Sequence, residues 1–123
     1  MKFISLQHIS IEDPGTFKDF LIEDGHSITT IQLDEGDSIP NNLDEFDAML
    51  CMGGPMDTFM EDQYPWLVAE KKAIGEYVLN LKKPFLGFCL GCQLLGEVLG
   101  GKVVESKPPE IGVLDINLSL IHI

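Results

Sequence analysis

The sequence contains no arginine, and its 8 lysines face 20 acidic residues, which gives a formal net charge of −12 over 123 residues. A chain with so few cations offers no basic patch for nucleic acid or for an anionic lipid surface. It also lacks the planar side chain that most often binds a carboxylate or phosphate in a bidentate manner, so a bound anion must be held by backbone N–H groups or by lysine. We therefore expect neither a nucleic-acid partner nor a membrane partner.

No apolar run approaches the roughly 20 residues that a bilayer span requires, and the first eight residues show no signal-peptide pattern. The chain has only three cysteines, Cys51, Cys89 and Cys92. An odd number of cysteines without a secretion signal favours reduced thiols and predicts a cytoplasmic location. Because 45% of the residues are hydrophobic, there is still enough apolar material for a core, and the composition predicts one soluble domain over residues 1–123.

Short apolar runs alternate with amphipathic segments along the chain, a pattern that predicts alternating strands and helices. We expect strands over residues 3–8, 27–33, 46–52, 84–88 and 102–105, and helices over residues 16–24, 67–81 and 90–99. In the helix over 67–81 we place Glu70 on the polar face, with Lys71, Lys72 and Glu76. The opposite, apolar face is marked by Leu67, by Ala73 or Ile74, and by Val78 and Leu81. The order and the helix-length connections predict an α/β fold, a parallel sheet with helices on both faces.

The last part of the chain differs from the rest. Residues 108–112 are expected to form a loop, and residues 113–123 look like a strand that stops in an apolar run. A sheet of this class would not normally end on an uncapped apolar edge. The sequence therefore predicts a fragment, truncated at its C-terminus, whose residues 114–123 come from a frame shift or an artificial end.

The most informative pattern is Gly87-Phe88-Cys89-Leu90-Gly91, which lies between a predicted strand and a predicted helix. It is typical of a nucleophile elbow, a tight turn that exposes the central side chain, and its two glycines allow close packing. Cys89 would stand at a helix N-terminus, where the helix dipole favours a thiolate, and the N–H of Leu90 would face a developing oxyanion. The pattern predicts a nucleophilic cysteine, and the alternative is a buried cysteine in a glycine-bounded turn.

Cys89 and Cys92 also form a C-x-x-C pattern at a helix start, which is typical of thiol-disulfide oxidoreductases. Its position after the fourth expected strand argues against that hypothesis, because thioredoxin-like domains carry the motif after an early strand. A third hypothesis is a catalytically inactive binding module. His8, His26 and His122 are scattered singly, so we expect no zinc site.

Two glycines, Gly53 and Gly54, follow the third expected strand. Because neighbouring parallel strands deliver their loops to one edge of the sheet, we expect a backbone N–H from this loop to lie beside Cys89. Tyr64 and Trp66 are expected to pack at the start of the long helix, and we interpret His8 and His26 as structural residues.

Several motifs together resemble a known family. They are Gly53-Gly54-Pro55, Tyr64-Pro65-Trp66-Leu67 with Glu70-Lys71, the run from Pro84 to Leu95, Leu99-Gly100-Gly101 and Glu110-Ile111-Gly112. The chain resembles the class I glutamine amidotransferases and is most similar to the stand-alone proteins related to the glutaminase domain of GMP synthase. This resemblance implies a flavodoxin-like fold, no metal or organic cofactor, and glutamine as substrate.

The resemblance also implies residue roles. Cys89 would attack the side-chain amide of glutamine, with Gly54 and Leu90 as the oxyanion hole and with Gly53, Gly54 and Gln93 binding the substrate. The ammonia would pass to a synthase domain or subunit. The family completes its catalytic triad with a histidine followed two positions later by an acidic residue, whereas His122 is the only histidine after Cys89 and has no such partner. We therefore expect this chain to be a weak or inactive glutaminase.

Overall fold

The computed structural model describes residues 1–108, 112, 113 and 115. It contains a parallel four-stranded sheet in the order β2-β1-β3-β4. The strands are β1 (Lys2–Gln7), β2 (Ser27–Gln32), β3 (Ala48–Cys51) and β4 (Phe85–Gly87). The predicted α/β fold is confirmed, and this strand order is that of flavodoxin-like sheets.

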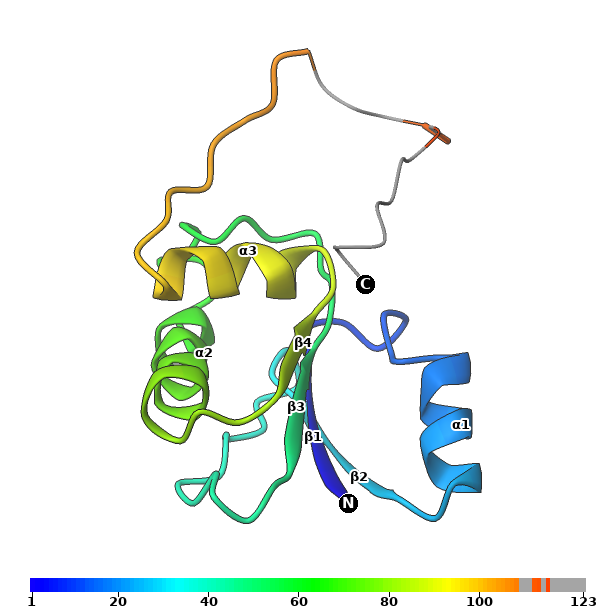
Figure 1. Cartoon of the computed structure of the whole chain (residues 1–123). Helices are drawn as coiled ribbons and strands as arrows, with labels where there is room; N and C mark the ends of the chain where they lie inside the picture. The colour runs from blue at the N-terminus through cyan, green and yellow to red at the C-terminus, as the bar shows by residue number, and fades with distance from the viewer. Residues whose placement is uncertain (109–111, 114, 116–123) are drawn as a thin grey trace.

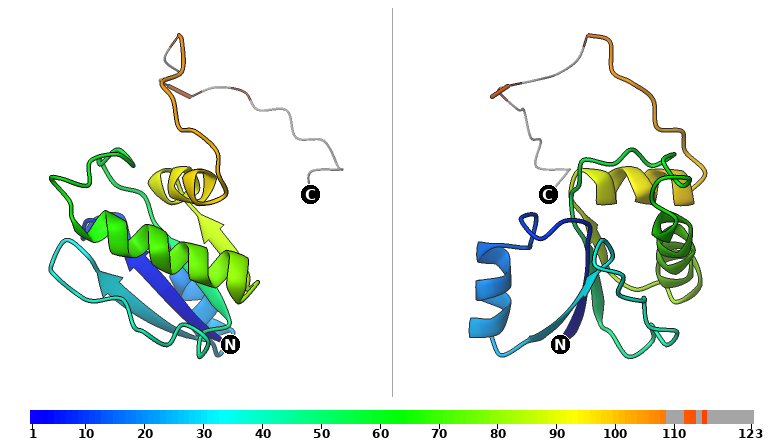
Figure 2. Two further views of the ribbon diagram at one scale, coloured as in Figure 1. Left: turned by 90° about the vertical axis from the view of Figure 1, so that its left-hand side faces the viewer. Right: turned by 180° about the vertical axis from the view of Figure 1, so that it is seen from behind.

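The helices cover both faces of the sheet, as predicted. One face carries α1 (Thr16–Glu23), and the other carries α2 (Trp66–Gly75), its π-helical continuation η1 (Glu76–Asn80) and α3 (Leu90–Val98). The views in Figure 1 and Figure 2 agree on this division. The long helix expected over residues 67–81 therefore exists, but its last part is π-helical rather than α-helical.

Three strands end side by side at one edge of the sheet. In the register, Leu6 of β1 pairs with Cys51 of β3, and Cys51 pairs with Gly87 of β4. The segments that leave these strands start at His8, Met52 and Phe88. The chain therefore gathers three loops at the carboxyl ends of parallel strands, where ligands bind in open sheets of this class.

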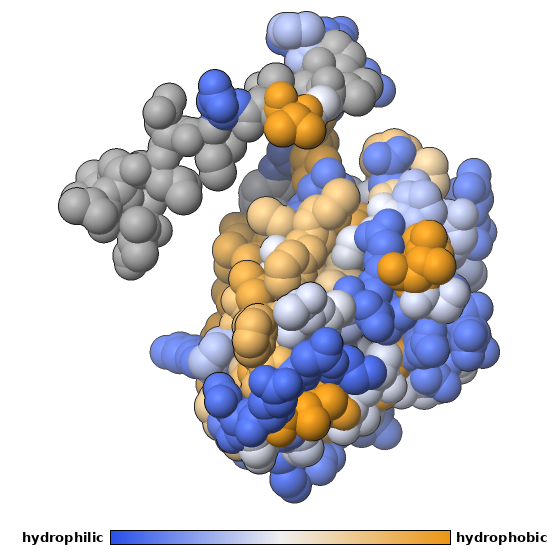
Figure 3. Space-filling model, turned by 90° about the vertical axis from the view of Figure 1, so that its right-hand side faces the viewer, coloured by the Kyte–Doolittle hydropathy of each residue, from blue (hydrophilic) through white to orange (hydrophobic). Residues whose placement is uncertain are grey.

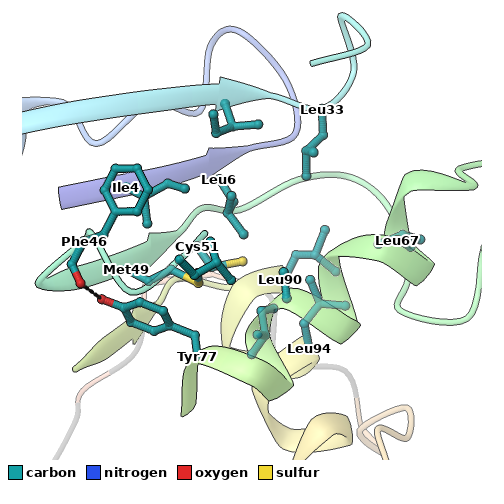
Figure 4. Close-up of a cluster of buried hydrophobic side chains, with 14 of the residues drawn as sticks. Ile4, Leu6, Leu33, Phe46, Met49, Cys51, Leu67, Tyr77, Leu90 and Leu94 are labelled. Atoms are coloured by element: carbon teal, nitrogen blue, oxygen red, sulfur yellow. Dashed lines mark hydrogen bonds between the residues drawn. The ribbon is translucent and has the colours of Figure 1, made fainter. Parts of the chain in front are cut away.

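The larger core lies between the sheet and α2, η1 and α3 (Figure 4). Leu67 and Ile74 are fully buried, which confirms the predicted inner face of the long helix. Tyr77 is also buried and donates its hydroxyl hydrogen to the carbonyl oxygen of Phe46 at 3.0 Å. Because the one polar atom of Tyr77 has a partner, the aromatic ring can pack in the core at little cost.

The core on the α1 side is smaller. Leu21 is the one residue of α1 that is buried, while Phe17 is 39% and Phe20 is 60% exposed. A shallow apolar groove lies beside α1, lined partly by Phe17 and by Leu86 of β4. Figure 3 shows apolar side chains gathered in a band on this side of the molecule. The sheet is therefore well covered on one face and partly covered on the other.

Two predictions are wrong. Residues 102–105 do not form a strand, and Val104 is 70% exposed. Valines favour an extended backbone, but a strand also needs a neighbour with which to exchange hydrogen bonds, and this segment runs away from the sheet after α3 (Figure 1). Glu70 does not lie on a polar face, because it is fully buried. Its partners, described below, replace the water that a carboxylate requires.

The predictions for the last part of the chain, including those for Glu110 and His122, fall on residues 109–111, 114 and 116–123, which lie outside the described residues. In the part of the chain that the structure does describe, no helix has the length and apolar character needed to cross a membrane.

Candidate active site

Cys89 stands in the turn between β4 and α3, at the position that caps the helix N-terminus. Its φ angle is +48°, a left-handed conformation that is uncommon for residues other than glycine. Backbone strain of this kind persists only where the surrounding structure enforces it, and it is frequent at functional sites. The turn leaves Cys89 exposed at the positive end of the α3 dipole.

Gly87 and Gly91 enforce this turn by close backbone packing. A Cβ atom on Gly87 would lie 2.5 Å from the carbonyl carbon of Gly91, and one on Gly91 would lie 2.7 Å from the carbonyl carbon of Cys51. Neither position has room for a side chain. The N–H of Phe88 also donates to the Cys51 carbonyl at 2.9 Å, so the turn is fastened to the end of β3.

The turn at Gly53 and Gly54 lies against the Cys89 turn. A Cβ atom on Gly53 would be 3.5 Å from the Cβ of Cys89, and one on Gly54 would be 3.3 Å from Cδ2 of Leu90. The structure therefore brings together the two turns that the sequence places at one edge of the sheet. It adds a residue that sequence reasoning missed, since the half-buried Glu12 has its carboxylate where a Cβ atom on Gly53 would stand.

Backbone N–H groups beside Cys89 have no hydrogen-bond acceptor among the described residues. They include those of Gly54 and of Leu90, the first residue of α3. Free donors of this kind can stabilise negative charge on an oxygen atom that is bound next to the thiol. Gln93 lies one turn into α3, and its side chain is exposed. Its role in binding a substrate stays a prediction.

The carbonyl group of Gly53 is held from inside the molecule by His8. His8 Nδ1 lies 2.8 Å from the Gly53 oxygen, and His8 Nε2 lies 2.8 Å from Glu70 Oε1. Both side chains are fully buried. Cys51 donates its thiol hydrogen to the same Glu70 oxygen at 3.3 Å, and the His8 ring stacks on Trp66 with 5.4 Å between ring centroids. The Glu70 side chain therefore links α2 to β3 and to the residue that follows β1.

These contacts favour a charged His8. A carbonyl oxygen can only accept, and Glu70 Oε1 already accepts from Cys51, so both contacts of the ring are satisfied when both ring nitrogens carry a hydrogen. Burial alone lowers the pKa of His8, but the hydrogen bond and the attraction to Glu70, aided by Gly53 and Glu12, outweigh it and raise this pKa above 6.5. Burial and the Glu70 carboxylate raise the pKa of Cys51 well above its usual range. Cys51 therefore remains a neutral thiol.

His8, Cys51 and Glu70 offer ligand atoms of three metal-binding types, all within 4.8 Å of one another. The separations of 2.8 Å between His8 Nε2 and Glu70 Oε1 and of 3.3 Å between Cys51 Sγ and the same oxygen are those of hydrogen bonds. We therefore interpret this cluster as a hydrogen-bonded network. Its second carboxylate oxygen, Glu70 Oε2, is buried and has no partner among the described residues.

Among the described residues, no histidine is free to act as a base at Cys89. His8 uses both ring nitrogens, as described above. His26 contacts the N-terminal amine at 3.3 Å and precedes β2, at the opposite edge of the sheet. The interpretation of both as structural residues agrees with these contacts.

A cavity lies between α2 and the segment that follows β2, with Leu33, Ile39 and Trp66 among its lining residues. None of the residues that line it belongs to the Cys89 turn or to the Gly53–Gly54 turn. The candidate active site therefore lies apart from this cavity.

The sequence and structure match known proteins. The family described as glutamine amidotransferase class-I matches residues 17–120. The glutamine amidotransferase-like protein YfeJ of Salmonella typhimurium is 35% identical over 115 residues, which cover 91% of this chain and 48% of that protein. A glutamine-hydrolyzing GMP synthase subunit of Sulfurisphaera tokodaii is 38% identical over 80 residues, covering 63% of this chain and 38% of that protein.

Solved structures agree with the sequence matches. The crystal structure of a glutamine amidotransferase from Thermotoga maritima aligns with a TM-score of 0.77 and 34% identity, covering 81% of this chain and 43% of that chain. The chain thus spans less than half the length of these relatives.

Proposed function

Because this chain belongs to the class-I glutamine amidotransferase family, we propose that Cys89 is the nucleophile of a glutaminase, which hydrolyses the side-chain amide of glutamine to glutamate and ammonia. One observation carries the proposal. An exposed cysteine stands in a strained turn at the N-terminus of α3, beside two backbone N–H groups that have no acceptor among the described residues.

The reaction follows from this geometry. The Cys89 thiolate adds to the amide carbon, and the electron pair of the carbonyl moves to its oxygen, where the N–H groups of Gly54 and Leu90 stabilise it. The adduct then expels the nitrogen, which takes up a proton and leaves as ammonia, and water hydrolyses the remaining γ-glutamyl thioester. One oxyanion donor is typically worth about 100-fold to 1000-fold in rate. Gly53, Gly54 and Gln93 would bind the rest of the glutamine.

Proton transfer limits the turnover of the 123-residue polypeptide. The departing ammonia needs a proton donor, and no histidine among the described residues is free to supply one. Cys89 still stands exposed at the positive end of the α3 dipole. We therefore expect covalent capture of a glutamine analogue by this polypeptide, with slow hydrolysis of glutamine itself.

The ammonia requires an acceptor. Similarity to a protein named as part of a glutamine-hydrolyzing GMP synthase supports the proposal that the whole protein supplies ammonia to a synthase domain or subunit. The hydrolysis steps themselves need neither a metal ion nor an organic cofactor.

Labelling with an α-chloroketone analogue of glutamine tests the proposal. We expect a single adduct on Cys89, formed at least tenfold faster than with a chloroketone that lacks the α-amino and α-carboxylate groups. Cys89→Ser should abolish the reaction, and Cys92→Ser is the matched control that should preserve it. Equal rates for the two ketones would contradict glutamine recognition. Loss of labelling in Cys92→Ser would favour thiol-disulfide exchange, which needs the second thiol.

A further inference from the structure

The peptide group between Gly53 and Gly54 has two ends with different surroundings. Its carbonyl oxygen accepts a hydrogen bond from the fully buried His8, and its N–H has no acceptor among the described residues. In a planar trans peptide, the C=O and the N–H point in opposite directions. A contact that draws the Gly53 carbonyl into the core therefore directs the Gly54 N–H outward, on the side away from His8.

We propose that His8 and Glu70 are positioning residues that orient and polarise the N–H of Gly54 as an oxyanion donor, an inference that rests on the proposed function of Cys89. His8 acts on the carbonyl end of the peptide, and the negative charge develops at the N–H end. Glu70 holds the ring in place from α2.

Charge makes this contact effective. An imidazolium that donates to the Gly53 carbonyl draws electron density from the amide and strengthens its N–H as a donor. Without Glu70, burial would favour neutral His8. In one of the two neutral tautomers, Nδ1 would present a lone pair to the carbonyl oxygen, and the contact would become repulsive. The direction of the Gly54 N–H thus depends on the charge of His8.

The groups around His8 all favour that charge. Glu70 faces it from α2, Glu12 contributes attraction from the segment after β1, and Cys51 on β3 remains a neutral thiol. Lys71, the next residue after Glu70 on α2, pairs with Glu61 and Glu97 instead. A buried ion pair is often no more stabilising than well-packed apolar side chains, so the pair needs an explanation other than stability. Orientation of the adjacent Gly53–Gly54 peptide supplies it.

The test compares two reagents for Cys89 in a Cys92→Ser chain. The glutamine chloroketone gains negative charge on its ketone oxygen as sulfur approaches, whereas iodoacetamide reacts by direct displacement at a saturated carbon. We call the rate constant for the glutamine chloroketone divided by that for iodoacetamide the ketone ratio. Both reactions use the Cys89 thiolate, so the thiolate fraction cancels and the ketone ratio reports oxyanion stabilisation. Glu70→Gln keeps an acceptor for the His8 ring and removes the charge. We expect it to lower the ketone ratio at least tenfold.

Glu97→Gln is the matched control, because it also removes a carboxylate from an ion pair, with Lys71, but lies in the last turn of α3. Its ketone ratio should stay within twofold of the parent. A folded Glu70→Gln chain with an unchanged ratio would overturn the inference while leaving the proposed function intact. A parent chain that does not react faster with the glutamine chloroketone than with the chloroketone lacking the α-amino and α-carboxylate groups would instead contradict the proposed function.

The pH profile keeps the inference testable if Glu70→Gln does not fold. With His8 and Glu70 unchanged, the ketone ratio should be constant at low pH and fall as pH rises through the raised pKa of His8. A folded Glu70→Gln chain should show this fall at lower pH. A ratio that does not change with pH in the parent chain would overturn the inference.

Discussion

The two turns that meet at Cys89 are held by different forces. The Cys89 turn is fixed by contact between backbones, because Gly87 packs on Gly91 and Gly91 packs on the end of β3 at Cys51. The Gly53–Gly54 turn is fixed by a hydrogen bond from an ionisable ring, which a buried carboxylate holds in turn.

Because of this difference, the two turns of the site can be disrupted in different ways. Steric packing does not respond to pH or charge, so the nucleophile keeps its position under any condition in which the chain is folded. When the His8 ring loses its proton from Nδ1, a lone pair faces the Gly53 carbonyl and the hydrogen bond is lost, so the orientation of the Gly54 N–H depends on the protonation of His8. We therefore expect some substitutions to unfold the chain and so displace Cys89. Others should leave Cys89 in place and remove only the Gly54 N–H as an oxyanion donor.

The largest effect should come from Gly91→Ala. Its methyl group would stand 2.7 Å from the carbonyl carbon of Cys51, and backbone cannot move aside as a flexible side chain can. We expect a loss of stability above about 4 kcal/mol in urea unfolding. Gly96→Ala is the control in the same helix, because nothing lies within 4 Å of its Cβ position. It should be neutral or stabilising by up to about 1 kcal/mol. A stable Gly91→Ala chain would contradict steric control of this turn.

The next effect should come from His8→Phe, which keeps an aromatic ring against Trp66 but leaves Glu70 buried without its cationic partner. The expected loss is about 3 to 5 kcal/mol. The double variant His8→Phe/Glu70→Leu should recover most of the stability, because no unpaired charge remains. The ketone ratio should stay low in the double variant. Recovery of that ratio together with stability would show that His8 and Glu70 serve only packing.

A smaller effect should appear as a pH dependence of stability. The folded-state pKa of His8 is raised, so its protonated form contributes stability that is fully present below pH 6.5 and is lost as pH rises through the raised value. The free energy of unfolding of the parent should therefore fall as the pH rises above 6.5 and through the raised pKa of His8, relative to His8→Phe/Glu70→Leu. Parallel pH profiles of the two proteins would be evidence against a charged His8.

The smallest effect should come from Cys92→Ser. Cys92 is exposed on α3 and is a free thiol, and its side chain takes no part in the contacts that fix either turn. We expect stability within about 0.5 kcal/mol of the parent and a rate of Cys89 labelling within about twofold. A tenfold loss of labelling would assign Cys92 a role that the glutaminase proposal does not include.

The sequence predicted the Cys89 turn well because its determinants are local. A strand, a glycine on each side of the cysteine and an apolar helix all lie within a short stretch of chain, and the structure has them in that order, although the strand is only partly buried. The parallel sheet was also predictable, from apolar runs separated by helices. The strand expected over residues 102–105 failed because pairing is not local, and this segment has no neighbour at the sheet edge.

The support of the Gly53–Gly54 turn was missed, although a signal was present. Glu70 was assigned to the polar face because of its charge, yet it follows Leu67 by three positions and precedes Ile74 by four, so it lies on the apolar stripe. A carboxylate in that position requires a buried partner. The partner, His8, is 62 residues away in the sequence, and spacing in a single sequence cannot identify a contact over that distance.

A crystal structure of the 123-residue chain after reaction with the glutamine chloroketone tests the central claim most directly. We expect a bond from Cys89 Sγ to the carbon that carried the displaced chloride, with the ketone oxygen within hydrogen-bond distance of the backbone nitrogens of Gly54 and Leu90, and with the Gly53 carbonyl still bonded to His8. An adduct on Cys92, or an oxygen that faces solvent away from both nitrogens, would contradict it.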